Sequence, residues 1–182
     1  MKTLYFTTRE YVFAALLAGA LLAVSSIIIP LTLPLRIPGL ANAVNAPFAS
    51  FFLVIGLARL RKPGSLLLIL GIYALICLMI HPVIFFFIMT GAMVAEIVCW
   101  LIFRGFRTPK AQVTGVILYE LASFPAAMLF SLWLMPARAL KPALWVFIVA
   151  EAAIFITALL GALAGLKVAR ELARAGKLHI ED

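Results

Sequence analysis

The stretch AALLAGALLA, Ala14–Ala23, forms the centre of the first long apolar run of the chain, Tyr11–Ile29. A run of about 20 apolar residues is long enough for a helix to cross a bilayer. Small residues four positions apart let two such helices approach closely, which matters because lipid provides little hydrophobic drive for helix association. The stretch contains three such pairs: Ala14 with Ala18, Ala15 with Gly19, and Gly19 with Ala23. It therefore predicts a transmembrane helix that packs through faces of small residues.

The composition of the whole chain extends this prediction. Of its 182 residues, 66% are hydrophobic and 12% are charged, and the mean hydropathy is +1.19. Soluble domains are about half apolar and about a quarter charged, so this composition predicts an integral membrane protein. The length accommodates about five or six spans with short loops. We therefore expect residues 1–182 to form a single membrane domain.

Apolar runs separated by basic or proline-rich segments predict an all-α bundle of six transmembrane helices, with a five-helix count as the alternative. The expected spans are residues 10–29, 42–60, 65–80, 83–103, 112–135 and 143–168. Between the first two spans, the segment Pro30–Phe48 contains four prolines. Proline removes a backbone donor and disfavours helix in the residue before it. We therefore expect a long, extended first outer loop there.

The distribution of Lys and Arg predicts the orientation of this bundle. Placing both termini in the cytoplasm gives twelve basic residues inside and three outside, in agreement with the positive-inside rule. The inner residues are Lys2, Arg9, Arg59, Arg61, Lys62, Arg104, Arg107, Lys110, Lys167, Arg170, Arg174 and Lys177. The outer ones are Arg36, Arg138 and Lys141. The expected location is the plasma membrane of a prokaryote, as a multi-pass protein with both termini cytoplasmic.

Two carboxyl groups lie inside apolar runs at a similar depth. Glu96 and Glu120 each stand about eight residues, or roughly 12 Å, from the inner end of their spans. Burying such groups in lipid is costly unless they are paired. The two side chains are therefore expected to form either a structural hydrogen-bonded pair or a proton-sharing pair.

Four residues near the outer face are candidate substrate contacts: Asn42, His81, Trp145 and Glu151. Glu151 is a lone acid in the outer third of the last span, and a lone acid facing an outer cavity suits a ligand contact. The Asn42 amide suits hydrogen bonding to a heterocyclic solute, and Trp145 suits stacking on its ring. His81, beside Pro82, is either a helix cap or a further contact.

Several function classes have no support in the sequence. The basic residues stand at the ends of apolar runs, as expected for lipid headgroups, so no nucleic-acid partner is predicted. No HExxH, GxSxG or Walker motif is present, so no catalytic residue or enzymatic activity is expected. The two cysteines, Cys77 and Cys99, lie in apolar runs without neighbouring ligands. Neither a metal site nor a cofactor is predicted.

Taken together, the chain resembles the substrate-binding S components of energy-coupling factor (ECF) transporters, a class of ABC importers. The resemblance rests on AxxxA at Ala14 and Ala18, RKPGS at Arg61–Ser65 and GAMVAE at Gly91–Glu96, in this order within six spans. It is closest to members that are unassigned or of thiamine-precursor type. The resemblance implies capture of a vitamin or vitamin precursor at the outer face. It also implies docking, through Ala14 and Ala18, on a transmembrane coupling subunit driven by two ABC ATPases.

Two other functions fit the same residues. One is a stand-alone proton-coupled secondary carrier that uses Glu96 and Glu120. The other is a membrane scaffold or assembly protein that binds no solute.

Overall fold

Helices account for all regular structure in the part of the chain that the computed structural model describes, residues 6–35, 37–136 and 143–175. In order they are α1 (Thr8–Thr32), the short 3-10 helix η1 (Leu33–Leu35), α2 (Leu40–Leu60), α3 (Ser65–Leu78), α4 (Pro82–Phe103), α5 (Pro109–Leu134) and α6 (Leu144–Arg174). All the α-helices except α3 are long and apolar enough to cross a membrane, and α3 has 14 residues. The expected all-α membrane fold is confirmed, and each expected span corresponds to one α-helix.

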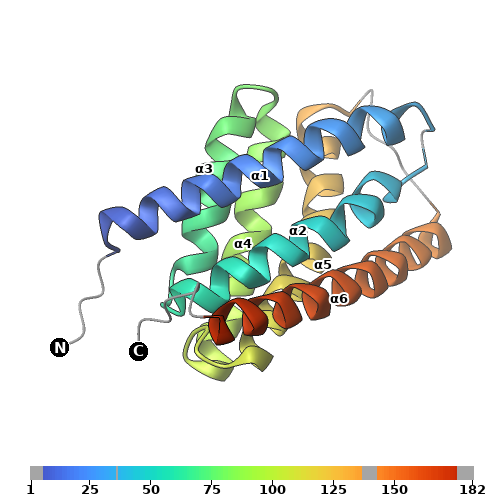
Figure 1. Ribbon diagram of the computed structural model, residues 1–182. Helices are drawn as coiled ribbons and strands as arrows, with labels where there is room; N and C mark the ends of the chain where they lie inside the picture. Colours follow the sequence, from blue (N-terminus) through green and yellow to red (C-terminus); the bar gives the residue numbers. More distant parts are fainter. Residues whose placement is uncertain (1–5, 36, 137–142, 176–182) are drawn as a thin grey trace.

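The helices form two layers. α2 packs between α1 and α6, while α3, α4 and α5 lie behind these three helices (Figure 1). The N-terminus of α1, the C-terminus of α6 and the α2–α3 turn lie at one end of the bundle (Figure 1). η1, the α3–α4 turn and the start of α6 lie at the other end. Side chains from different layers can therefore meet inside the bundle at either end.

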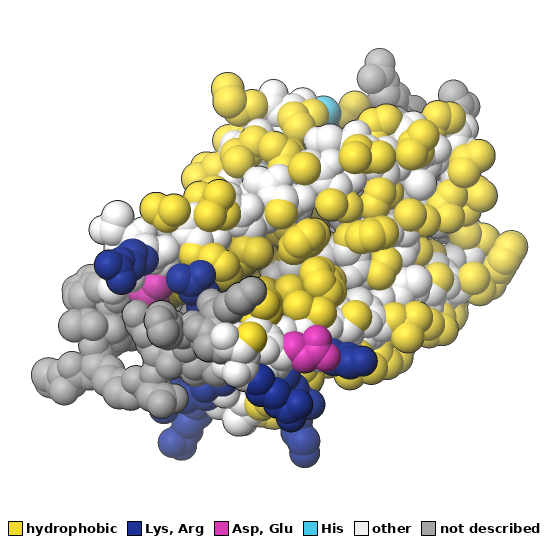
Figure 2. All heavy atoms as spheres, in the orientation of Figure 1, with side chains coloured by type: hydrophobic (Ala, Val, Ile, Leu, Met, Phe, Trp, Pro, Cys, Tyr) yellow, Lys and Arg dark blue, Asp and Glu magenta, His cyan; other side chains and the backbone are white. Residues whose placement is uncertain are grey.

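Basic side chains gather at the first of these ends, where Figure 2 shows Lys and Arg in dark blue. They belong to the turn Arg59–Ser65, the segment Arg104–Lys110 and the last turns of α6. We call this the basic end, and we call the opposite end, with η1 and His81, the far end. The asymmetry agrees with the one expected from the sequence. Five basic residues of that expectation lie outside the described residues: Lys2, Arg36, Arg138, Lys141 and Lys177.

The segment that follows α1 is mostly helical, which corrects the expectation of a long extended loop over Pro30–Phe48. α1 continues to Thr32 with Pro30 inside it, and α2 begins at Leu40 and includes Pro47. A helix satisfies backbone polar groups internally, whereas an extended segment would leave them unpaired in lipid. This requirement outweighs the cost of proline in a helix. The first connection is therefore short.

Glycines allow α2 and α6 to pack backbone against backbone. A Cβ atom on Gly161 would overlap the carbonyl oxygen of Pro47. One on Gly165 would lie 2.6 Å from the carbonyl oxygen of Phe51. Because the obstacle in both cases is backbone rather than a flexible side chain, neither position has room for a larger residue. This contact holds α2 close to α6.

The small residues of α1 divide between two faces. Ala14 and Ala18 are fully buried in the core of the protein, so they pack α1 against its own bundle. This corrects the expectation that they form the docking face, because a partner has no access to them in this structure. Ala15, Gly19 and Ala23 are exposed instead. The four-residue spacing therefore serves internal packing on one face and leaves a second small-residue face open.

The α2–α6 contact leads to a testable expectation. Gly161→Ala should lower the free energy of unfolding by about 1–3 kcal/mol, because overpacking forces the two backbones apart. The matched control is Gly71→Ala in α3, where an added Cβ has nothing within 4 Å. That change should be neutral or stabilising by up to about 1 kcal/mol, since alanine favours helix over glycine. Thermal unfolding in detergent checks both variants. Equal unfolding midpoints for Gly161→Ala and Gly71→Ala would show that the close α2–α6 contact does not contribute to stability.

Candidate ligand-binding site

A large open cavity lies at the far end of the bundle. Its volume is about 1120 Å³. Its walls come from the last turns of α1, η1, the first turns of α2 and α4, and the last turns of α5. Asn42 and His81 are among its polar lining residues. The cavity therefore opens at the end opposite the basic residues.

A smaller chamber of about 270 Å³ extends this cavity into the bundle. The two spaces share four lining residues, Ile29, Ala41, Asn42 and Ile84, so they adjoin. The chamber is reached by polar side chains from four helices. These are Ser25 of α1, Asn42 and Asn45 of α2, Tyr73 of α3, and Tyr119, Glu120 and Ser123 of α5. The chamber has the form of a binding site, since it is concave, mostly apolar and has a few convergent polar groups.

Three of these side chains form a hydrogen-bonded chain across the layers. The Tyr73 hydroxyl donates to Ser25 Oγ at 3.1 Å. Ser25 Oγ in turn donates to Asn45 Oδ1 at 3.2 Å. Asn45 therefore uses its carbonyl oxygen in this chain, and its amide NH₂ remains a donor at the chamber wall. The chain fixes the orientation of all three side chains.

Glu120 differs from these residues because its carboxyl group is not satisfied. Its side chain is 6% exposed, and Oε1 has no hydrogen-bond partner among the described residues. Ser123, one turn away, donates to the backbone carbonyl of Glu120 at 2.9 Å rather than to the carboxyl. An unpaired carboxyl inside a membrane protein is costly and marks a functional site by default. Glu120 is thus the strongest single candidate in the chamber.

Glu96 lies in a different environment, so the expected pair of Glu96 and Glu120 does not form. The Glu96 carboxylate accepts hydrogen bonds from the backbone N–H groups of Gly64 and Leu67, at 2.5 and 3.4 Å. These groups belong to the N-terminus of α3, where free N–H donors and the helix dipole favour a negative charge. Glu96 therefore anchors α3 to α4 at the basic end, on its own.

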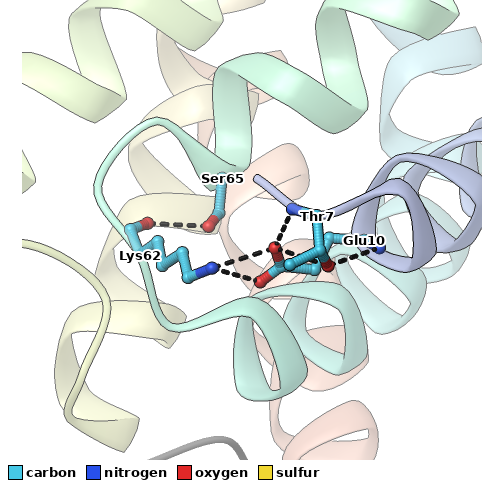
Figure 3. A network of polar contacts seen from close by, with 4 residues as sticks. All are labelled: Thr7, Glu10, Lys62 and Ser65. Carbon is cyan, nitrogen blue, oxygen red and sulfur yellow. Dashed lines mark hydrogen bonds and ion pairs between the residues drawn. The ribbon is translucent and has the colours of Figure 1, made fainter. Parts of the chain in front are cut away.

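A second acid holds the same turn from the other side. The Glu10 carboxylate of α1 lies 2.7 Å from the Lys62 ammonium and also accepts the N–H of Thr7 at 2.6 Å. Ser65 Oγ donates to the carbonyl of Lys62 at 2.7 Å (Figure 3). The α2–α3 turn is thus connected to α1 through Glu10 and to α4 through Glu96. Glu10 and Glu96 are thus both satisfied, in contrast to Glu120.

The four expected substrate contacts are only partly brought together. Asn42 lines both spaces, and His81 lines the outer cavity. His81 also caps α4, because its Nδ1 accepts the N–H of Val83 at 3.2 Å. Trp145 is 69% exposed near the start of α6 and lines neither space. Glu151 also lines neither space, although its two carboxylate oxygens are buried and have no hydrogen-bond partner among the described residues.

Sequence reasoning missed Ser25, Asn45 and Tyr73 as chamber residues. The available signal was an uncharged polar residue within an apolar run, which is weak because such residues also serve as internal helix contacts. No group of three or more His, Cys, Asp or Glu residues that could hold a metal ion occurs within the described ranges. The polar groups that do line the chamber are suited to an organic ligand that forms hydrogen bonds.

Comparisons with known proteins identify the fold. No protein-family model matches the chain, and no curated protein matches it. A solved structure that matches is a crystal structure of an S-component of an ECF transporter, with a TM-score of 0.65 and 20% sequence identity. The match covers 96% of this chain and 89% of that one. The chain therefore has the fold of an ECF S component, as the sequence resemblance led us to expect.

The contribution of Glu96 as an anchor of α3 can be measured as a change in the free energy of unfolding. Glu96→Ala should lower the free energy of unfolding by about 1–3 kcal/mol, because it leaves N–H groups of α3 without a partner. Glu171→Ala, which removes an exposed acid on α6, should change it by no more than about 0.5 kcal/mol. Thermal unfolding of the two variants in the same detergent makes the comparison. If the two variants unfold at the same temperature, Glu96 is not an anchor of α3.

Proposed function

We propose that this chain is the membrane-embedded substrate-capture subunit of an ECF-type importer. The observation that carries the proposal is the S-component fold, which extends over 96% of the chain. A far-end cavity that leads to an unsatisfied carboxyl supports it. In this role the subunit binds a vitamin or vitamin precursor at the outer face and has no ATPase activity. A transmembrane coupling subunit and two ABC ATPases complete the importer.

The charge distribution supports the orientation that such an importer needs. Basic residues favour the cytoplasmic side, so the basic end faces the cytoplasm and the far end faces outward. Both termini are then cytoplasmic, and the cavity with Asn42 and His81 opens to the outside of a prokaryotic plasma membrane. A solute would enter there and reach the chamber that contains Glu120. Trp145 and Glu151 do not belong to this proposed site.

The exposed small-residue face of α1 is the surface that we assign to the coupling subunit. Ala15, Gly19 and Ala23 are four residues apart and open to the membrane. An added Cβ on Gly19 has nothing within 4 Å, so the protein itself does not use this space. Another helix can approach the α1 backbone closely here, which is how helices associate in lipid.

The proposal predicts a strict dependence of uptake on the ATPases. The full chain should retain a small molecule through purification, identified by mass spectrometry of the extracted solute. Cells that produce the chain with its coupling module should take up that solute, and substitution of the Walker lysine of the ATPases should abolish uptake. Uptake by the chain alone, collapsed by a protonophore, would instead establish the proton-coupled carrier.

The assigned docking face predicts a separation of binding from transport. Gly19→Trp should disrupt the complex with the coupling subunit and stop uptake, because a large ring prevents close helix approach. The variant should still fold and hold its solute, since Gly19 faces open space. Gly71→Trp, the same change at another glycine with open space, should leave the complex intact. Co-purification of the coupling subunit with each variant gives the result, and a normal complex with Gly19→Trp would refute the assignment.

A further inference from the structure

The chamber contains one acidic group and no basic one. Among its lining residues only Glu120 is ionisable near neutral pH, and none is Lys, Arg or His. Among the described residues, the adjoining outer cavity adds only His81, whose Nδ1 already accepts the Val83 N–H. Within the chamber itself, a bound anion would therefore meet an acid and none of the described basic groups. Solutes that carry a carboxylate or a phosphate group are poorly matched to this chamber.

The unsatisfied atom defines what the chamber lacks. Glu120 Oε1 is buried and accepts no hydrogen bond from the described residues, and the residue is 94% buried with the chamber as its neighbouring space. The nearby Ser25 and Tyr73 hydroxyls donate to other acceptors. Among the described residues no donor lies within hydrogen-bond reach of this oxygen, so a ligand in the adjoining chamber can supply the missing partner. It must be a donor, and a charged donor forms the stronger hydrogen bond.

The remaining walls restrict the size and polarity of that ligand. The chamber, at about 270 Å³, lies below the range of about 300–1,000 Å³ typical of drug-sized ligands. Phe87, Tyr73 and Tyr119 line it beside aliphatic residues. Aromatic rings attract a cation or the polarised edge of a flat ring. The Asn45 NH₂ group provides a single neutral donor for an acceptor atom on the ligand.

We infer that the chamber binds a small organic nitrogen base, in which a protonated amine or amidine-type group contacts Glu120 and a flat apolar body packs against the aromatic residues. The inference rests on the proposed function and specifies the substrate class of the same site. A planar pair of N–H donors matches the two oxygens of a carboxylate with two parallel hydrogen bonds. The same inference excludes acids and phosphate esters as substrates.

Three probes of one shape and different charge test this inference. Benzamidine, benzamide and benzoate are nearly isosteric and carry a positive, a neutral and a negative head group. Titration calorimetry on the full chain in detergent, freed of co-purified solute, should give the tightest binding for benzamidine. Benzamide should bind roughly tenfold to a hundredfold more weakly, because it lacks the charged donor pair. Benzoate should show no binding.

Matched variants connect the result to Glu120. Glu120→Gln should weaken benzamidine binding to the level of benzamide and leave benzamide itself nearly unchanged. Glu151→Gln alters another buried acid without a partner, outside the chamber, and should bind benzamidine as the parent does. Equal binding of benzamidine by Glu120→Gln and the parent, tighter binding of benzoate, or no binding of any probe would overturn the inference. Binding of Na⁺ alone at Glu120 would overturn it as well.

The co-purified solute separates failure of this inference from failure of the proposed function. A nitrogen base that is lost from Glu120→Gln and retained by Glu151→Gln supports the inference. An acid or phosphate ester whose uptake still requires the ATPases refutes the inference while the importer proposal stands. Uptake that does not require the ATPases refutes the importer proposal, whichever probe binds.

Discussion

The contact between the backbones of α2 and α6 is the constraint on which the site depends. In lipid, helix association relies on close packing because there is little water to exclude. Gly161 and Gly165 provide that closeness by receiving the backbone of α2 at Pro47 and Phe51. Asn45 lies two residues before Pro47 on the same helix, so the contact also determines where its amide stands. The side chains of the chamber are thus positioned by residues that have almost no side chain themselves.

Three acids of the apolar helices, Glu10, Glu96 and Glu120, follow the same electrostatic rule, in which a buried charge needs a partner. The rule has two outcomes here. At the basic end, Glu10 meets an ammonium group and Glu96 meets the N-terminus of α3. Each gains donors that offset the cost of leaving water. Among the described residues, Glu120 Oε1 has no such partner, and neither have the two carboxylate oxygens of Glu151. Of these two acids Glu120 is the one that lines the chamber, where a bound ligand can supply the missing hydrogen bond.

The sequence was sufficient for the order of the helices, because apolar length and basic flanks are local properties that identify spans. The ends were less accurate: the span expected from residue 112 begins at Pro109, and the last helix continues to Arg174 rather than to residue 168. The orientation of each helix about its own axis was not accessible in the same way. A spacing of four residues occurs on both faces of α1, so it could not distinguish Ala14 and Ala18 from Ala15 and Gly19. Equal depth likewise suggested a pair at Glu96 and Glu120, although the two side chains face different neighbours.

The extended loop over Pro30–Phe48 was wrong for a different reason. Proline disfavours the interior of a helix because it removes one backbone hydrogen bond and its ring clashes with the preceding turn. Near a bilayer the alternative to helix costs more, and the prolines were absorbed into α1 and α2. Asn42, which was expected at the start of the second span, belongs to the first turn of α2 and lines both the cavity and the chamber.

α1 links the three regions that the proposed function requires. Glu10 contacts the α2–α3 turn, Gly19 belongs to the exposed small-residue face, and Ser25 belongs to the hydrogen-bonded chain of the chamber. These residues span about 22 Å of one uninterrupted helix. Because one helix carries all three, a tilt or rotation of α1 on ligand binding would move the proposed docking face together with the wall of the chamber. In the proposed function, α1 is therefore the element that connects occupancy of the chamber with the coupling subunit.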